Sequence, residues 1–113
     1  FPIVPLRFHL NNNVVDSSAL IDSGATVSVC KEEMAEKLGI KLETGKEIFL
    51  GGVGGHIKGY IHNLNLEIAG KKFLCPIVFS REYTVSFNLL GREAFFKQFK
   101  IIFEEKKNLL TIE

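Results

Sequence analysis

Short apolar segments of strand length, separated by turn residues, run along most of the chain and favour an all-β fold. Residues 2–10 carry apolar side chains at loosely alternating positions, and three asparagines at 11–13 then predict a turn. The same reasoning predicts further strands at 14–15 with 18–21, 47–50, 56–68 and 72–79, and a closing hairpin from 101–103 and 109–112. Because 113 residues suit one core, we expect a single domain over residues 1–113.

Helical spacing of apolar residues occurs in two short segments. In residues 31–38, Met34, Ala35 and Leu38 share one face, and Gly39 follows where a helix would stop. Residues 92–99 carry three phenylalanines at helical spacing, which predicts a second short helix. The expected fold is therefore all-β with one or two short helices, and the ten phenylalanines of the chain can supply much of its core.

The charge balance and the hydropathy exclude several classes of partner. The formal net charge is +1, which gives no electrostatic reason to bind a nucleic acid or an anionic membrane. No apolar stretch approaches the roughly 20 residues that a membrane span needs, so we expect a soluble domain without one. The cellular compartment stays open, because a cytoplasmic domain and a domain excised from a longer protein would both fit.

The residues that most often bind metals are scattered along the sequence. His9, His56 and His62 lack the spacing of a metal site, so no metal and no cofactor are expected. Cys30 and Cys75 lie inside apolar segments without metal-like spacing, which predicts two buried thiols. The alternative for this pair is a disulfide or a redox role.

The tetrapeptide Asp22-Ser23-Gly24-Ala25 follows directly on the apolar segment 18–21. An aspartate is rarely fully buried unless it is paired, yet this segment directs Asp22 toward an interior. One interpretation is a turn in which Asp22 and Ser23 bond their own backbone and Gly24 takes a positive φ. The other is a carboxylate held in place for chemistry, which would explain why an apolar strand precedes it.

Residues 49–57 place four glycines around one valine, between two strand-like segments. A phosphate-binding loop would need Lys-Ser or Lys-Thr and then a helix, whereas this stretch continues into the predicted strand 56–68. Glycine loses much conformational entropy on folding, so a hairpin tip this rich in glycine indicates a moving flap or a close backbone approach. The alternative is a mobile turn without a role.

A third stretch, residues 88–93, places an apolar pair and Gly91 just before a helix start. Together with residues 20–25 and 49–57, it resembles in order and separation the pattern of the retropepsins, the single-domain aspartic proteases of retroviruses and their relatives. The resemblance extends from about residue 2 to residue 103. It implies a retropepsin-like acid protease barrel that forms a two-fold homodimer, and the activity of an aspartic endopeptidase.

The resemblance assigns the catalytic positions to Asp22, Ser23 and Gly24. An aspartic protease needs two carboxylates that share one proton, so a chain with one such motif implies that Asp22 of each subunit meets its mate on the axis. The substrate would be an extended peptide or protein segment with apolar side chains near the scissile bond. The residues implied to bind it are Ala25, Thr26, Val29, Leu50, Gly51, Gly52, Val53, Gly54, Phe87 and Leu89.

Two departures from the family pattern change what we expect. Thr26 stands where viral members have an aspartate that pairs with the arginine matching Arg92. A structural Arg92 would then need another partner among Glu93, Glu32, Glu33 and Glu36, or it is a surface residue at a helix start. The N-terminal strand of viral members has no counterpart here, so the dimer contacts are expected from the C-terminal hairpin, residues 101–112, with the active-site loops.

The activity itself leaves alternatives open. A catalytically weak domain of the same fold, used for dimerisation or peptide binding, is one, and an unrelated β-barrel with a chance Asp-Ser-Gly is another. The intact Asp22, Ser23 and flap glycines favour the enzyme, because a retired site has no chemical reason to keep its aspartate. Ala25 cannot donate a hydrogen bond to the carboxylates, which predicts a mildly acidic pH optimum of roughly 4.5–6.5.

Overall fold

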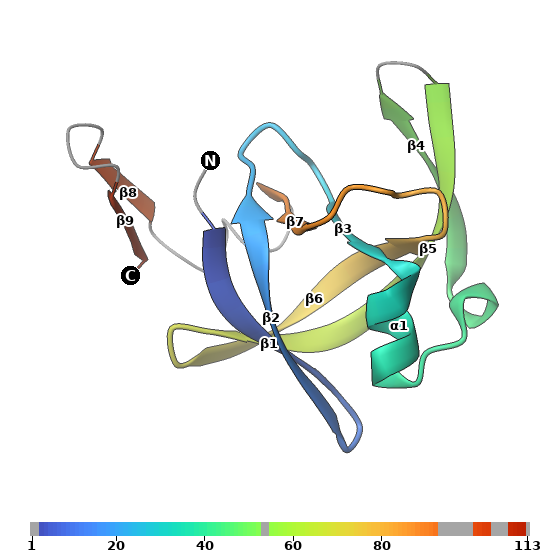
Figure 1. Cartoon of the computed structure of the whole chain (residues 1–113), viewed down its shortest axis with the longest axis horizontal. Helices are drawn as coiled ribbons and strands as arrows, with labels where there is room; N and C mark the ends of the chain where they lie inside the picture. The colour runs from blue at the N-terminus through green and yellow to red at the C-terminus, as the bar shows by residue number, and fades with distance from the viewer. Residues whose placement is uncertain (1–2, 53–54, 93–100, 105–108, 113) are drawn as a thin grey trace.

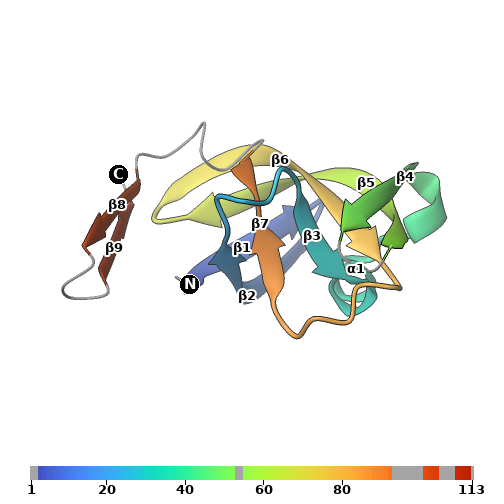
Figure 2. The same cartoon turned by 90° about the horizontal axis from the view of Figure 1, so that it is seen from above.

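Six strands close into a barrel in the computed structural model, which describes residues 3–52, 55–92, 101–104 and 109–112 (Figure 1). The barrel strands are β1 (Ile3–Leu10), β2 (Asn13–Ile21), β3 (Ser28–Lys31), β5 (Gly55–Ile68), β6 (Lys71–Ser80) and β7 (Asn88–Leu90). Their order is β1-β2-β7-β3-β6-β5, and β5 pairs with β1 to close the barrel (Figure 2). The alternation predicted for the first strand is confirmed, because the buried Val4, Leu6 and Phe8 alternate with the exposed Ile3, Pro5 and Arg7.

Strand β5 has different partners along its length. Its residues 65–67 pair with β1, and residues 60–68 pair with β6. Residues 55–61 pair with β4 (Lys46–Gly52) in an antiparallel hairpin that projects from the barrel at the upper right of Figure 1. Strand β5 therefore belongs to both the barrel and the projecting hairpin and connects them without a break.

The helix predicted near residues 31–38 is α1 (Glu32–Leu38), and the single turn η1 (Leu42–Thr44) follows it before β4. As predicted, Met34, Ala35 and Leu38 are its buried residues and Gly39 ends it with a φ of 74°. The side-chain amide of Asn13 donates a hydrogen bond to the carbonyl oxygen of Leu38 at 3.0 Å, which satisfies one of the free carbonyls at the helix end. Apart from Arg92, the second predicted helix lies outside the described residues.

The core is mainly aliphatic. Phe8, Phe73 and Phe79 are buried, whereas Phe49 and Phe87 are 65% and 38% exposed. The side chains of the other five phenylalanines are not among those described, so the expectation that phenylalanines supply much of the core stays a prediction. The prediction of two buried thiols is confirmed, because Cys30 and Cys75 are both buried and free. Burial raises the pKa of Cys30 and raises that of Cys75 to about 11. The other large fully buried side chains are Ile21, Leu38, Leu64, Leu66, Ile77, Leu90 and Val78.

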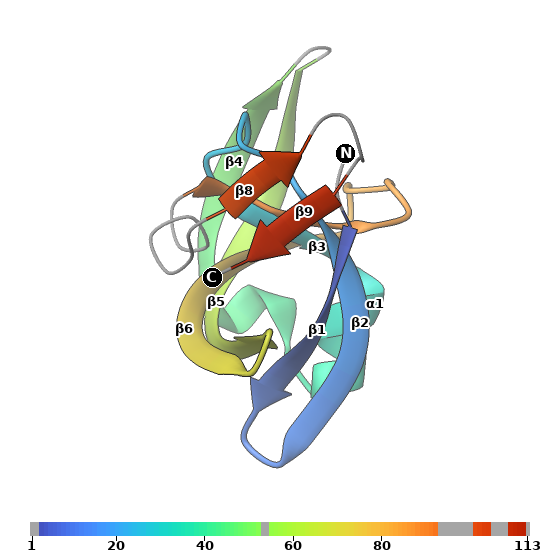
Figure 3. The ribbon, with the colours of Figure 1, turned by 90° about the vertical axis from the view of Figure 1, so that its left-hand side faces the viewer.

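The predicted closing hairpin is present as β8 (Ile101–Glu104) and β9 (Leu109–Ile112). The two strands are antiparallel, with Ile101 opposite Ile112, and form a sheet separate from the barrel sheet (Figure 3). Within the described ranges, no helix is long and apolar enough to cross a membrane.

Candidate active site

Asp22 is the first residue beyond β2, at the end of a strand whose last side chain is buried. Ile21 is 2% exposed, whereas Asp22 is partly buried and Ser23 is exposed. The N–H of Asp22 donates a hydrogen bond to the carbonyl oxygen of Leu90 at 3.0 Å, since β2 and β7 run parallel with Ile21 opposite Leu90. Two strands remote in sequence therefore fix the backbone at this carboxylate.

The loop after Asp22 folds back on the carboxylate. The N–H of Gly24 donates a hydrogen bond to Oδ1 of Asp22 at 2.8 Å, and the N–H of Ala25 donates to the Asp22 carbonyl oxygen at 3.2 Å. The self-bonded turn considered from the sequence is thus present at Asp22, but Gly24 does not have the positive φ expected of it. A Cβ at this position would lie 3.2 Å from Oδ1, so the Asp22 carboxylate would have to shift slightly to admit a side chain.

Only one oxygen of the Asp22 carboxylate is engaged by the described residues. In the same part of the chain, no buried side-chain oxygen or nitrogen lacks a hydrogen-bond partner, so the second oxygen is open to solvent. The turn therefore orients the carboxylate while it leaves one oxygen free to act on a ligand.

Gly91 explains how the third sequence motif contributes. A Cβ at this position would lie 2.5 Å from the Val27 carbonyl oxygen and 2.8 Å from that of Ala25, so the loop after Asp22 packs directly on the Gly91 backbone. The N–H of Arg92 donates to the Ala25 carbonyl oxygen at 2.8 Å. The turn at Gly91 thus supports the Asp22 loop through backbone contacts.

Two buried polar side chains complete this support, and sequence reasoning gave neither a role. The amide nitrogen of Asn88 donates to Oγ of Ser17 at 3.1 Å and to the Ser18 carbonyl oxygen at 2.9 Å, which links β7 to β2. Oγ of Ser28 accepts a hydrogen bond from the Gly91 N–H at 3.1 Å. The available signal was a polar residue at the edge of an apolar run, since such a group is buried only when it is hydrogen-bonded.

A partly exposed carboxylate on a braced loop, at the ends of two parallel strands, matches a known family. The family model described as aspartyl protease matches residues 4–94 of the chain. The chain belongs to the aspartyl protease family. It is an aspartic endopeptidase, as predicted from the three motifs.

The fold comparison agrees with the family match. Among solved structures, the protease is similar to EIAV protease in complex with the inhibitor HBY-793, with a TM-score of 0.67, 19% sequence identity and 86% of each chain covered. At this identity the likeness concerns the fold, and it confirms the predicted retropepsin-like barrel. No curated protein matches the sequence.

The β4–β5 hairpin of the protease is where the sequence predicts the flap. Its pairing runs from Lys46 opposite Ile61 to Gly52 opposite Gly55, so the glycine-rich stretch is confirmed as a hairpin. Leu50 is partly buried and Gly51 is exposed. The predicted contacts of Val53 and Gly54 lie outside the described residues.

The predicted pocket residues of the protease are only partly brought together. Val29 and Leu89 lie opposite each other on β3 and β7, although Val29 is 4% exposed and offers little surface to a ligand. Phe87 lies just before β7 and is exposed, and its carbonyl oxygen accepts a hydrogen bond from the Tyr83 hydroxyl at 2.9 Å. Thr26 is exposed, and no described contact joins it or Leu50 to these residues.

The pairing predicted for Arg92 stays a prediction, because its candidate partner Glu93 lies outside the described residues. Its guanidinium is exposed and has no ion-pair partner among the described residues. Glu32, one of the expected partners, instead accepts a hydrogen bond from Nε of Arg81 at 2.5 Å. The described contribution of Arg92 to the site is its backbone N–H.

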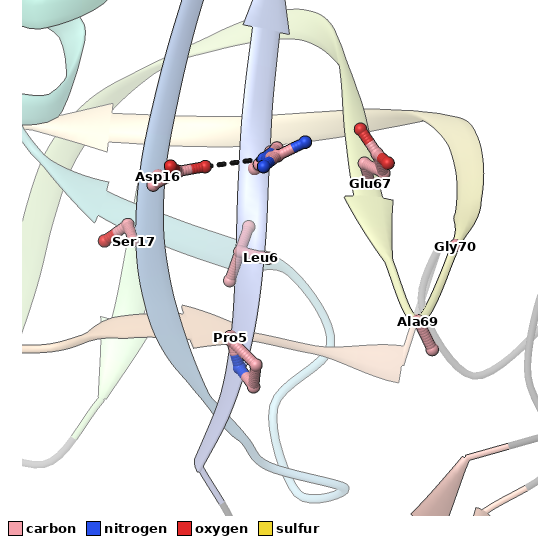
Figure 4. Close-up of a pocket in the computed structure, with 8 residues that line it drawn as sticks. Pro5, Leu6, Asp16, Ser17, Glu67, Ala69 and Gly70 are labelled. Atoms are coloured by element: carbon pink, nitrogen blue, oxygen red, sulfur yellow. Dashed lines mark hydrogen bonds and ion pairs between the residues drawn. The ribbon is translucent and has the colours of Figure 1, made fainter.

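Other charged and metal-binding residue types of the protease do not form a second candidate site among the described residues. The described residues contain no group of three or more His, Cys, Asp or Glu that could hold a metal ion. Asp16 is 76% exposed and pairs with Arg7 at 2.7 Å, in line with its interpretation as a solvated residue. This pair borders a depression between β1, β2 and the β5–β6 turn, which contains none of the predicted site residues (Figure 4).

Proposed function

We propose that the protease acts as a homodimer in which Asp22 of each copy supplies one of two catalytic carboxylates. The observation that carries this proposal is the placement of the two aspartates that the chain contains. Asp16 precedes Asp22 along β2 by six residues, or about 20 Å at the usual rise per residue, and it is bound to Arg7. One chain therefore offers one aspartate at the braced loop, and a second copy must supply the other through a two-fold axis.

The pair of Asp22 carboxylates would share one proton, because two adjacent charges cannot both form cheaply. The ionised carboxylate takes a proton from a water molecule, whose oxygen attacks the scissile carbonyl carbon. The protonated carboxylate donates its proton to the carbonyl oxygen. The tetrahedral intermediate then breaks at the C–N bond. The carboxyl group that took the proton from water gives it to the leaving nitrogen, and the other carboxylate takes back a proton from a hydroxyl of the intermediate.

The Asp22 loop is suited to this reaction because its carboxylate is already oriented. The Gly24 N–H holds Oδ1, and the rest of the loop is held by β7 and Gly91, so little reorganisation would accompany the reaction. The Ser23 hydroxyl would donate a hydrogen bond across the axis and join the two loops. Its exposure in the single chain supports a partner outside the chain.

The substrate would bind as an extended strand between the Asp22 loops and the flaps. Leu50, Leu89 and Phe87 would supply apolar surface to this peptide, so apolar or aromatic side chains should be preferred beside the scissile bond. The exposed Phe87 ring is bulky and would narrow at least one pocket.

The dimer contacts would come from the C-terminal hairpin and the active-site loops. An isolated two-stranded hairpin is at best marginally stable in water. The β8–β9 sheet is separate from the barrel sheet, which supports a role in which strands of a second copy extend it.

Cleavage of a random peptide library at about pH 3 to 8 tests the proposed mechanism. The parent should cut, with inhibition by pepstatin, and Asp22→Asn should not. Asp16→Asn is the matched control and should retain activity, since it changes the other aspartate without touching the loop. Equal cleavage by the parent and Asp22→Asn would refute the assignment of Asp22.

A mixing experiment tests the shared site. An excess of Asp22→Asn should suppress the activity of the parent, because mixed dimers carry one competent carboxylate. The same excess of Asp16→Asn should not suppress it. Sedimentation of an active parent as a monomer would overturn the homodimer.

A further inference from the structure

The β5–β6 ladder ends where the flap begins. Its last pair is Tyr60 opposite Phe79, and residues 55–59 of β5 pair only with β4 in the described part of the chain. At Gly59, the next residue toward the hairpin tip, β5 still lies close to β6, because a Cβ there would collide with the Val78 side chain and lie 3.2 Å from the Phe79 carbonyl oxygen. The base of the flap is therefore close to Lys58.

Both backbone polar groups of Lys58 are bound by side chains at the end of β6 and just after it. The N–H of Lys58 donates a hydrogen bond to Oε2 of Glu82 at 2.6 Å, and its carbonyl oxygen accepts one from Oγ of Ser80 at 2.5 Å. The Ser80 hydroxyl oxygen also accepts a hydrogen bond from the Glu82 N–H at 3.1 Å. A carboxylate acceptor gives a stronger bond to a backbone N–H than a neutral oxygen does. These contacts extend the attachment of β5 beyond its strand pairing.

Arg81, the residue before Glu82, is bound by two carboxylates from outside the flap. Arg81 donates hydrogen bonds to Glu32 on α1 and to Glu43 on η1. Glu43 and Glu32 both raise the pKa of Arg81, and the Arg81 side chain in turn lowers the pKa of Glu43. The start of the loop between β6 and β7 is thus tied to two elements that do not belong to the flap.

The same loop leads to the predicted pocket wall. Residues 81–87 connect β6 to β7, and the Tyr83 hydroxyl bonds the Phe87 carbonyl oxygen within it. Figure 1 shows this orange loop passing from β7 to the base of the β4–β5 hairpin. Glu82 therefore stands between the flap base and the segment that carries Phe87.

We propose that Glu82 is a positioning residue for proteolysis, which latches the base of the flap at Lys58 and sets the flap relative to the loop that carries Phe87. The inference rests on the proposed function, in which the flap closes over the peptide. With the latch, flap motion is confined to the hairpin beyond Lys58. Without it, Lys58 keeps only the hydrogen bond of its carbonyl oxygen to Ser80. Closure must then also order the Lys58 backbone, so the bound state becomes less favourable while the chemistry at Asp22 is unchanged.

Hydrogen exchange and kinetics of two Glu82 variants test the latch. In Glu82→Ala, the Lys58 amide should exchange at least about tenfold faster, because it loses its acceptor. KM should rise about five- to tenfold with kcat within about twofold of the parent, since the loss falls on binding. Glu82→Gln keeps an oxygen acceptor and should restore both values to within about threefold.

Glu47→Ala is the matched control. Glu47 lines the same depression as Glu82 and Lys58, but no described hydrogen bond joins it to Lys58, so exchange and KM should stay at the parent values. Glu82 is exposed, so the variants should fold, which circular dichroism would check.

An unchanged exchange rate at Lys58 in Glu82→Ala would overturn the latch. Faster exchange with an unchanged KM would overturn its role in proteolysis. These outcomes differ from a failure of the proposed function, which would show as activity that persists in Asp22→Asn.

Discussion

Replacing Gly91 by alanine should damage the Asp22 loop more than it damages the fold. The new Cβ would lie 2.5 Å from the Val27 carbonyl oxygen, whereas ordinary contact begins near 3.4 Å. The backbone at Val27 or Gly91 would therefore have to move by about 0.9 Å. The hydrogen bond from the Arg92 N–H to Ala25 joins the same two segments and would be strained by that movement.

The magnitude follows from the cost of overpacking and from the geometry of catalysis. Inserting a methyl group into a packed site costs about 1–3 kcal/mol, which should lower Tm by about 4–13 °C for a domain of this size. A displacement near 1 Å of a catalytic group can lower the rate about 100-fold. We therefore expect kcat of Gly91→Ala to fall by about 30- to 100-fold at a temperature where the variant is folded.

Gly45→Ala is the control that separates the loss of stability from the loss of kcat. Gly45 lies between η1 and β4, and a Cβ there would collide with the Ile61 carbonyl oxygen on β5, which is a clash of the same kind. Figure 1 shows that region at the right, away from the light-blue loop after β2. Gly45→Ala should lower Tm by a similar amount but keep kcat within about threefold of the parent. If Gly91→Ala kept the same kcat as Gly45→Ala, the proposed support of the Asp22 loop by Gly91 would be wrong.

Three further predictions use other parts of the molecule. Removing residues 108–113, which include β9, should give an inactive monomer by sedimentation and peptide cleavage, and an active or dimeric product would contradict the proposed dimer contacts. Asn88→Ala leaves the Ser18 carbonyl oxygen without its donor, so urea unfolding should show a loss of about 1–3 kcal/mol; a loss below about 0.5 kcal/mol would show that the link is dispensable. Burial raises the pKa of Cys75 from its ordinary 9.0 to about 11, so the folded chain keeps a proton that the unfolded chain loses. Stability should therefore fall as pH rises above about 9, by up to about 1.4 kcal/mol per pH unit for this thiol, and a slope in Cys75→Ala equal to that of the parent would contradict this cause.

Local signals in the sequence were sufficient for the elements that depend on neighbours in the chain. The helix ending at Gly39, the hairpin at residues 46–61 and the closing hairpin all follow from periodicity and turn residues. The short strands β3 and β7 were not predicted. Each has only three or four residues and begins with a polar residue, Ser28 or Asn88, so neither shows a clear alternation.

The candidate site depends on contacts that no local pattern contains. The motif identified Asp22, but its backbone partner Leu90 comes from a parallel strand far along the chain. The sequence left open whether the Arg92 side chain pairs with a glutamate or lies at the surface. Its described contact is made by its N–H, a group that every residue except proline carries. Glu82 could not be singled out for the same reason, because its partner is also a backbone group.

The parallel pairing of β2 with β7 has a consequence for the order of events during synthesis. Asn88 and Ser18, which link these strands, are 70 residues apart in sequence. Local hairpins such as β1–β2 and β5–β6 can form early, whereas contacts between distant segments form late because closing a long loop costs entropy. A nascent chain on the ribosome would carry Asp22 without its support until β7 had emerged, so the protease should gain its catalytic geometry only when synthesis of the barrel is nearly complete.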